Sequence, residues 1–347
     1  SDLTLRDMPV LGWDRVLFVG DRVAAVAAET PEAAAEAIAA IQVEYQVLAA
    51  VFDPIEAMST TAPQLHEDVT RYGGPAPERL AADLHNGATR LLWRRGNLEE
   101  ALNDADVVLE HTFRIPTRHQ GYLEPHVCTV DIDESGRIHL WAACKTPFRG
   151  RMQLAHAIGV PEEQILVHPV SVGGDFGGKG DVVDAPIAYF LARETGRPVT
   201  IQITSADDLA TSNPDQYTQV TIKSAVTFDG QITGRQIRTV HACGAYAALK
   251  PNGAYSTWHQ VGGCYQIPNG EYEFLQIYTN TAPGGYFRAP GAHQLVFATE
   301  CHMDLLAAEL SMDPAEFRLK NFMHEGEDDA IGTRMEHLKA REVLQAA

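Results

Sequence analysis

The chain has 347 residues, of which 45% are hydrophobic and 21% are charged. This composition is typical of a folded globular protein of roughly two or three domains, and it excludes a disordered or fibrous class. Because 27 Lys and Arg residues face 46 Asp and Glu residues, the formal net charge is −19, and we expect no nucleic-acid partner. No apolar run approaches the roughly 20 residues that cross a bilayer, so we expect no membrane span.

The cysteines indicate a reduced protein without a metal cluster of its own. They are odd in number, widely spaced and free of any C-x-x-C pair, so we expect buried thiols, no zinc or iron–sulfur ligand set and a cytoplasmic location. The five are Cys128, Cys144, Cys243, Cys264 and Cys301.

The N-terminal part predicts a small α+β unit. Alternating apolar residues over 16–28 predict a β-hairpin that turns at Gly20-Asp21, and Thr30-Pro31 predicts the start of a helix. We place the end of this domain at residue 58. Prolines and glycines interrupt a polar sequence over 59–105, which predicts an extended linker.

The remaining residues, 106–347, predict a second domain of mixed strands and helices. The pattern predicts strands at 107–115, on either side of a turn at 134–136, at 165–172, 199–203 and 272–280, with a hairpin over 219–240 that turns at Asp229-Gly230. It predicts helices at 147–159, 182–196 and 294–310, and a further helix from Asp313-Pro314.

A glycine-rich loop, Gly173–Gly180, lies between a predicted strand and a predicted helix. Its glycines let the backbone approach a ligand closely and direct N–H groups at an anion or an oxo group. The spacing of Gly173 and Gly178-Lys179 also approaches that of a phosphate-binding P-loop. Gly180 replaces the Ser or Thr that holds Mg²⁺ there, which argues against a nucleotide triphosphatase; a purely structural turn is another alternative.

A second loop, Gly284–Gly291, precedes the helix predicted at 294–310. It carries Arg288, whose planar guanidinium is suited to a phosphate or a carboxylate beside a helix N-terminus. Read alone, Arg288 is equally typical of an exposed loop residue or of a salt-bridge partner.

Four ordered motifs carry a resemblance to a known family: QGYLEPHVCTV (120–130), VSVGGDFGGKG (170–180), CYQIPN (264–269) and YFRAPGAHQ (286–294). Together they resemble the molybdenum-binding subunits of the xanthine dehydrogenase and aldehyde oxidase family, over about residues 10–325. The resemblance implies an α+β fold, that is, one of mixed α/β content. An N-terminally incomplete α/β hammerhead domain would cover 1–58, and the first molybdopterin-binding domain would cover 106–347.

The resemblance also implies a cofactor, molybdopterin in its cytosine dinucleotide form, which holds molybdenum through a dithiolene, so the protein supplies no direct metal ligand. The implied cofactor-binding residues are Gly174, Asp175, Phe176, Gly177, Gly178, Arg288 and Lys145. The implied reaction oxidises an N-heteroaromatic, an aldehyde or a related small molecule with water as the oxygen source. Electrons then leave through a 2Fe-2S subunit and an FAD subunit.

The family's catalytic base is a Glu in a C-terminal motif resembling GEPP, and no such motif occurs in this chain. We therefore expect no catalytic residue here, and a second molybdenum-domain chain that supplies the base. The chain looks like the first half of a molybdenum subunit. A non-catalytic assembly or cofactor-binding subunit of such a complex is the alternative.

Departures from the family pattern concern the substrate pocket, for which we expect Gly180, Ser256, Ala289 and Pro290. Gly180 replaces the Glu of purine-oxidising members and Pro290 replaces an aromatic residue, so xanthine itself is disfavoured. Lys145 replaces a Gln that bonds the cofactor, and it has donors only. We expect Lys145 either to contact a phosphate or a sulfido ligand, or to be solvated.

Several other side chains have both structural and functional interpretations. His119 and His126 lack any zinc-binding spacing, so we expect structural histidines, and we expect a structural role for Glu124 as well. Tyr246, Tyr255 and Trp258 are interpreted as lining a substrate funnel or as packing in the core.

Overall fold

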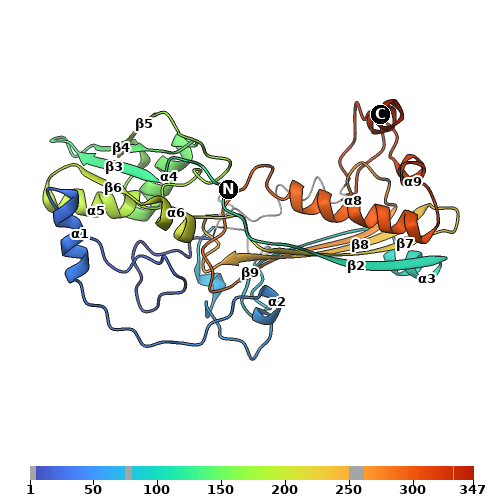
Figure 1. Cartoon of the computed structure of the whole chain (residues 1–347), viewed down its shortest axis with the longest axis horizontal. Helices are drawn as coiled ribbons and strands as arrows, with labels where there is room; N and C mark the ends of the chain where they lie inside the picture. The colour runs from blue at the N-terminus through green and yellow to red at the C-terminus, as the bar shows by residue number, and fades with distance from the viewer. Residues whose placement is uncertain (1–4, 75–79, 250–261, 331) are drawn as a thin grey trace.

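The computed structural model describes residues 5–74, 80–249, 262–330 and 332–347. Within these ranges the chain forms two separate β-sheets, each with helices packed on it (Figure 1). The mixed helix and strand content confirms the α+β prediction. No helix in the described ranges is both long enough and apolar enough to cross a bilayer.

The larger sheet has five strands and is mixed. Its order is β1 (Gly87–Arg95), β9 (Asn269–Tyr278), β8 (Ile232–Gly244), β7 (Thr218–Val226) and β2 (Val107–Ile115). The pair β8 and β9 is parallel, and the other pairs are antiparallel. Helix α8 (Ala292–Glu309) lies along one face, where its buried Leu295 and Leu306 join clusters with Ile222 and Ile232 of the sheet.

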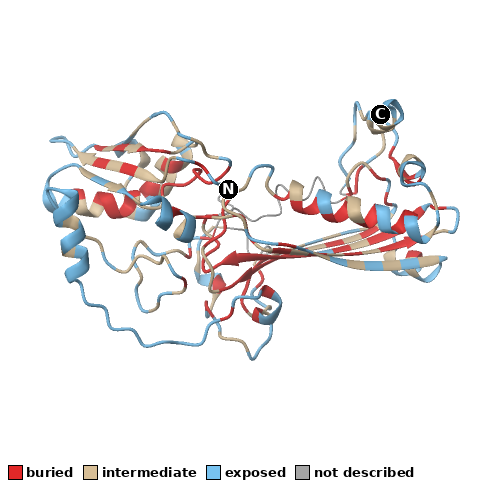
Figure 2. Cartoon of the chain, viewed as in Figure 1, coloured by how far each residue is buried: buried red, intermediate tan, exposed pale blue. Residues whose placement is uncertain are grey.

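The smaller sheet has four strands, in the order β5 (Ile165–His168), β4 (Ile138–Ala142), β3 (Val127–Ile132) and β6 (Val199–Gln202). Helices α4 (Pro147–Ile158) and α5 (Ala185–Thr195) pack against it. Leu140 of β4, Leu154 of α4 and Ala188 of α5 are completely buried in the shared core, and Figure 2 shows the buried faces turned toward each other.

The remaining helices are short. They are α1 (Pro31–Ala40), α2 (Pro54–Ala57), α3 (Leu98–Asn103), α6 (Ser205–Thr211), α9 (Pro314–Asn321), α10 (Ala340–Ala346) and the 3-10 turns η1 (Val69–Arg71) and η3 (Glu162–Gln164).

Several local predictions are confirmed. Helix α1 begins after Thr30, whose Oγ1 accepts a hydrogen bond from the Ala33 N–H at 3.2 Å, because an N-terminal helix turn needs acceptors for its amides. The hairpin turns at 134–136 and at Asp229-Gly230 separate β3 from β4 and β7 from β8. All five cysteines are free thiols, but only Cys128 and Cys243 are buried, so the expectation of buried thiols is wrong for the other three.

The hairpin predicted over 16–28 is wrong, because no strand forms in this segment of the described chain. Its turn contains a backbone hydrogen bond from Asp21 N to Phe18 O, and Arg22 O accepts from Gly12 N, which lies before the segment. An isolated two-stranded hairpin is only marginally stable in water, and no strand among the described residues pairs with this segment as a third strand.

The extended linker predicted over 59–105 is also wrong in its local structure, since it contains β1 and α3. Strand β1 forms because it pairs along its length with β9, a strand far away in the sequence. The domain boundaries themselves stay a prediction.

Candidate functional site

The glycine-rich loop, Gly173–Gly180, is fixed from inside by the carboxylate of Asp175. Its Oδ1 accepts from the Lys179 amide at 2.6 Å, and its Oδ2 accepts from the Gly177 amide at 2.8 Å and from Lys145 Nζ at 2.7 Å. Partial burial opposes ionisation of Asp175, but these donors outweigh it, and the pKa of the carboxyl lies below its ordinary value. These bonds therefore fix the shape of the loop from within the chain.

Lys179 lies beneath this loop with a completely buried side chain. Its Nζ is 3.1 Å from Glu124 Oε1 and 4.7 Å from the centre of the Tyr122 ring, a cation–π arrangement. Glu124 also accepts from the Gly173 amide. The structural role expected for Glu124 thus has a definite form: an ion pair that joins the start of the loop to its end.

This buried position of Lys179 also argues against the P-loop interpretation. A P-loop lysine reaches nucleotide phosphates, whereas this ammonium is engaged inside the chain. Helix α5 begins only at Ala185, so the loop does not run directly into a helix N-terminus.

A second layer of polar contacts supports the glycine-rich loop from below. Asp208 of α6 accepts from the Tyr122 hydroxyl at 2.8 Å and from the His126 amide at 2.7 Å, and it faces His126 Nδ1 at 3.1 Å. The other ring nitrogen of His126 lies 3.3 Å from the Gly178 carbonyl. Burial opposes ionisation of Asp208, yet hydrogen bonds from His119, His126 and Tyr122 hold its pKa well below the ordinary value.

The histidines expected to be structural therefore have hydrogen-bond partners. His126 connects Asp208 to the loop, and His119 Nε2 lies 3.0 Å from Ser212 Oγ. Tyr246 is buried in the core and donates to Asp21, which favours core packing over a funnel. Tyr255 and Trp258 lie outside the described residues.

The second loop, Gly284–Gly291, is fixed mainly by steric fit. A Cβ at Gly284 would lie 2.3 Å from Gln216 Cγ, and a Cβ at Gly285 would lie 2.4 Å from the Asn213 carbonyl oxygen. Only glycine fits at such distances, so the chain between α6 and β7 acts as the floor of this loop.

The end of the second loop is anchored by the completely buried carboxylate of Asp215. It accepts from His293 Nε2 at 2.9 Å and from Gln294 Nε2 at 3.0 Å, both at the start of α8, and Arg118 Nη2 lies 3.3 Å away. The Arg118 guanidinium also lies 5.0 Å from the centre of the Phe287 ring. These contacts hold the loop and the N-terminus of α8 together.

The two loops meet backbone against backbone. A Cβ at Gly177 would lie 2.3 Å from the Tyr286 carbonyl oxygen, and Gly177 has a φ of +111°. Gln120 Nε2 donates to the same Tyr286 carbonyl at 2.6 Å and to the Asn213 carbonyl at 2.9 Å. Two segments more than a hundred residues apart in sequence are thus in direct contact.

Several donors of this paired-loop site are open to a ligand. Within the described residues, the amides of Gly174, Asp175 and Phe176 have no protein acceptor, and Arg288 is exposed and makes no ion pair. Phe176 and Ala289 both have positive φ values, +46° and +56°, which are unfavourable for residues with a Cβ. Such strain is concentrated at ligand sites.

The predicted substrate-pocket residues are only partly brought to this site. Lys145 pairs with Asp175 rather than being fully solvated, and a Cβ at Gly180 would meet only the Lys145 Cε, at 3.8 Å. Ala289 and Pro290 follow Arg288 on the second loop. Ser256 lies outside the described residues. The roles of these residues stay predictions.

The sequence missed the residues that shape the site from beneath: Gln120, Asp208, Asn213, Asp215 and Gln216. The mostly polar run Ser212–Gln216 is the one sequence feature that points to them. Polar side chains that become buried between a helix and a strand need hydrogen-bond partners within the protein.

The structure is that of an α+β protein in which two glycine-rich loops pack against each other. A family model described as "Molybdopterin cofactor-binding domain" matches residues 82–322, and one described as "Aldehyde oxidase and xanthine dehydrogenase, a/b hammerhead domain" matches residues 3–49. The chain belongs to this molybdopterin-binding family, as the sequence motifs predict.

Individual relatives agree with this assignment. The chain is 34% identical over 319 residues to a probable xanthine dehydrogenase subunit of Bacillus subtilis, covering 92% of this chain and 41% of the relative. It is 27% identical over 335 residues to the nicotinate dehydrogenase large molybdopterin subunit of Eubacterium barkeri, covering 96% and 75%. The chain thus spans about two-fifths of the length of the first of these.

Solved structures show the same fold. CO dehydrogenase from Oligotropha carboxidovorans matches with a TM-score of 0.83 at 27% identity, over 93% of this chain and 41% of that one. An aldehyde oxidoreductase from Desulfovibrio desulfuricans matches with a TM-score of 0.89 at 22% identity, over 98% and 36%.

Proposed function

We propose that this chain binds molybdopterin in its cytosine dinucleotide form and is the cofactor-binding part of a molybdenum hydroxylase. The hydroxylase would oxidise an N-heteroaromatic, an aldehyde or a related small molecule with water as the oxygen source. The observation that carries the proposal is the packing of Gly177 against Tyr286, because it combines two motif-bearing loops into one cradle with open donors.

The residues present fit this cofactor. The open amides of Gly174, Asp175 and Phe176 suit its oxygen acceptors, and the guanidinium of Arg288, which has no ion-pair partner among the described residues, suits its phosphate. Gly177 keeps the backbone close to the ligand, since any Cβ there would displace the second loop. When bound, the cofactor supplies the two-electron oxidation; the chain's own residues position it and limit the access of water.

Lys145 is assigned an indirect role in this proposal. Its Nζ bonds to Asp175, which in turn accepts the Gly177 and Lys179 amides. The cation thus favours the ionised carboxylate that shapes the loop, and it stands at the site's rim with a partly exposed side chain.

The proposal needs partner chains. Within the described residues no group of three or more His, Cys, Asp or Glu side chains could hold a metal ion, and electrons need an acceptor. We therefore propose a 2Fe-2S subunit, an FAD subunit and a second molybdenum-domain segment that carries the catalytic base, all in the cytoplasm. Relatives named as subunits of dehydrogenases support such a complex.

The test is to purify the chain with its co-purifying partners and to measure molybdenum per chain and CMP released by acid hydrolysis. We expect near-stoichiometric molybdenum and CMP. The variant R288Q should lose most of both. The variant R193Q should retain them, because it removes another exposed arginine, which pairs with its neighbour Glu194 and lies over the Phe190 ring on α5.

Two outcomes would contradict the proposal in different ways. Wild-type material without molybdenum, from cells with an intact cofactor pathway and with the partner chains present, would overturn cofactor binding. Bound cofactor without turnover of any heteroaromatic or aldehyde, in the complete complex, would instead favour the non-catalytic assembly subunit.

A further inference from the structure

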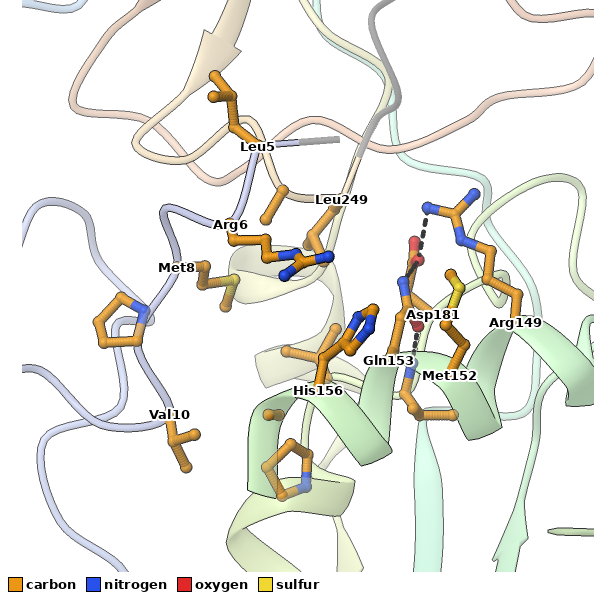
Figure 3. Close-up of a pocket in the computed structure, with 16 residues that line it drawn as sticks. Leu5, Arg6, Met8, Val10, Arg149, Met152, Gln153, His156, Asp181 and Leu249 are labelled. Carbon is orange, nitrogen blue, oxygen red and sulfur yellow. Dashed lines mark hydrogen bonds and ion pairs between the residues drawn. The ribbon is translucent and has the colours of Figure 1, made fainter. Parts of the chain in front are cut away.

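Two cations close to the glycine-rich loop are paired with carboxylates. Lys179 pairs with Glu124 beneath the loop. Arg149 of α4 lines a cavity of about 700 Å³, where its Nη2 lies 3.0 Å from the buried Asp181 (Figure 3). Arg235 of β8 is different, because its side chain is completely buried and makes no ion pair with any described residue.

The hydrogen bonds of the Arg235 side chain leave its charge uncompensated. Nε donates to Ser224 Oγ at 2.9 Å, and Nη2 donates to the Met303 sulfur at 3.2 Å, and both acceptors are neutral. Nη1 has no hydrogen-bond partner among the described residues. Burial lowers the pKa of the guanidinium from its ordinary value, but an arginine pKa is high enough that the group stays a cation.

Two buried hydroxyl groups without partners lie in the neighbourhood of this guanidinium. The Tyr272 ring folds back over Gly270, which pairs with Arg235, since a Cβ at Gly270 would lie 2.8 Å from Tyr272 Oη. Thr299 lies one helical turn before Met303, the residue that accepts from Nη2. Neither Tyr272 Oη nor Thr299 Oγ1 has a hydrogen-bond partner in the described part of the chain. Three donors therefore gather where α8 covers β8 and β9 (Figure 1).

The titratable groups nearest to Arg235 on α8 and β2 do not supply the missing negative charge. Glu300 Oε2 lies 2.8 Å from Arg318 Nη2, so this carboxylate already has a cation of its own. His302 is neutral, because burial lowers its pKa to about 2, and its Nδ1 lies 2.9 Å from His111 Nδ1. The space beneath α8 thus holds one positive charge without an opposite one among the described residues.

A small anion fits these groups better than a water molecule does. An unpaired charge in a protein interior is costly, and all three open groups can donate. An anion accepts from each donor and also neutralises the guanidinium, whereas water leaves the net charge in place. We propose that Arg235 Nη1, Tyr272 Oη and Thr299 Oγ1 bind a buried chloride ion between β8, β9 and α8. The ion ties α8 to the sheet, and its binding does not depend on the proposed function.

The test is urea denaturation of the purified full chain in mixtures of sodium chloride and sodium gluconate at constant ionic strength. Gluconate is too large for the site, so the mixtures keep the screening of surface charges equal. An ion that binds only the folded chain lowers the unfolding equilibrium constant in proportion to its concentration, once that concentration exceeds the dissociation constant. In this range we expect about a tenfold lower unfolding constant for each tenfold rise in chloride.

The variant R235M removes the cation and keeps a side chain of similar length. R235M should abolish the chloride dependence. At the lowest chloride concentration it should also be more stable than the wild type, because an apolar side chain replaces an uncompensated buried charge. R238M is the matched control. Arg238 lies on the same strand but is half exposed and pairs with Glu273, so R238M should keep the chloride dependence of the wild type.

The variant Y272F tests the site while keeping the cation. It retains the ring and removes one donor, so the chloride concentration needed for the effect should rise about tenfold. Y278F is its control, because Tyr278 is buried on the same strand and its hydroxyl donates to Asp7 at 2.7 Å. Y278F should lose stability and keep the wild-type chloride dependence.

A wild-type chain that is equally stable in chloride and in gluconate would overturn the proposal, and so would an unchanged chloride response in R235M. A chloride response as weak in Y278F as in Y272F would mean a general effect of lost packing and would also overturn it. A flat wild-type response combined with a less stable R235M would assign water, rather than an anion, to the Arg235 guanidinium.

Discussion

The two loops of the proposed cofactor site are held in place by different means. The glycine-rich loop is fixed by two ion pairs within the chain, Lys179 with Glu124 and Lys145 with Asp175. The second loop is fixed mainly by glycines packed against Asn213 and Gln216, with the buried Asp215 carboxylate anchoring its end, and its own charged side chain, Arg288, stays exposed. In the proposed function, the first loop therefore offers backbone amides to the cofactor, and the second offers a guanidinium.

The largest effect should come from breaking the ion pair of the first loop. E124Q leaves the completely buried Lys179 ammonium without a counter-ion, so we expect the free energy of unfolding to fall by about 3 kcal/mol. Urea denaturation measures it. The double variant E124Q/K179M removes both charges and should recover part of the loss; a double variant less stable than E124Q would contradict the ion-pair account.

A slightly smaller loss should follow from breaking the contact between the loops. G177A places a Cβ against the Tyr286 carbonyl at a positive φ, and overpacking plus backbone strain should cost about 2–3 kcal/mol. G196A is the control, since Gly196 also has a positive φ but its Cβ would meet nothing within 4 Å. Its loss should be about 1 kcal/mol. Equal losses in the two variants would mean that the loops are not in contact.

The stability that Asp208 contributes beneath the first loop should depend on pH. Hydrogen bonds hold the pKa of Asp208 below 3.8, so its carboxylate stabilises the fold above pH 3.8, and this contribution disappears as the pH falls through the folded-state pKa. D208N should cost about 2 kcal/mol at pH 7, and the difference from wild type should shrink below about pH 4. Urea denaturation from pH 7 to pH 3 measures this.

The neighbouring variant D207N is the control for this prediction, because Asp207 lies on the exposed side of α6. A pH-independent difference between D208N and wild type would show that Asp208 acts through shape rather than charge.

The smallest stability effect should come from the second loop's exposed arginine. Since Arg288 has no ion-pair partner in the described chain, R288Q should change the free energy of unfolding by less than about 0.5 kcal/mol. The same variant should lose cofactor, as measured by molybdenum content. A large loss of stability instead would place Arg288 in the framework and would remove the contrast between the loops.

The sequence predicts what depends on neighbours in the chain. Caps and turns, such as Thr30 before α1 and Asp229-Gly230 between β7 and β8, are encoded within a few residues. Both loops are also predictable, because their glycines are required by the local backbone conformation and by close packing.

Contacts between distant segments could not be predicted in this way. Strand β1 depends on β9, and the floor of the second loop depends on Asn213 and Gln216. No local pattern indicates which remote backbone a polar side chain meets. For the same reason, the apolar alternation over 16–28 predicts strands that lack a partner among the described residues.

The pairing of β1 with β9 also constrains the order in which the chain folds. The four-stranded sheet and its helices come from a continuous stretch, residues 127–202, so this lobe can complete its core soon after it is synthesised. Strand β1 precedes that stretch, yet the strand it pairs with follows it. One edge of the larger sheet therefore cannot form until the 173 residues between Arg95 and Asn269 have been synthesised, and we expect this high contact order to slow its formation.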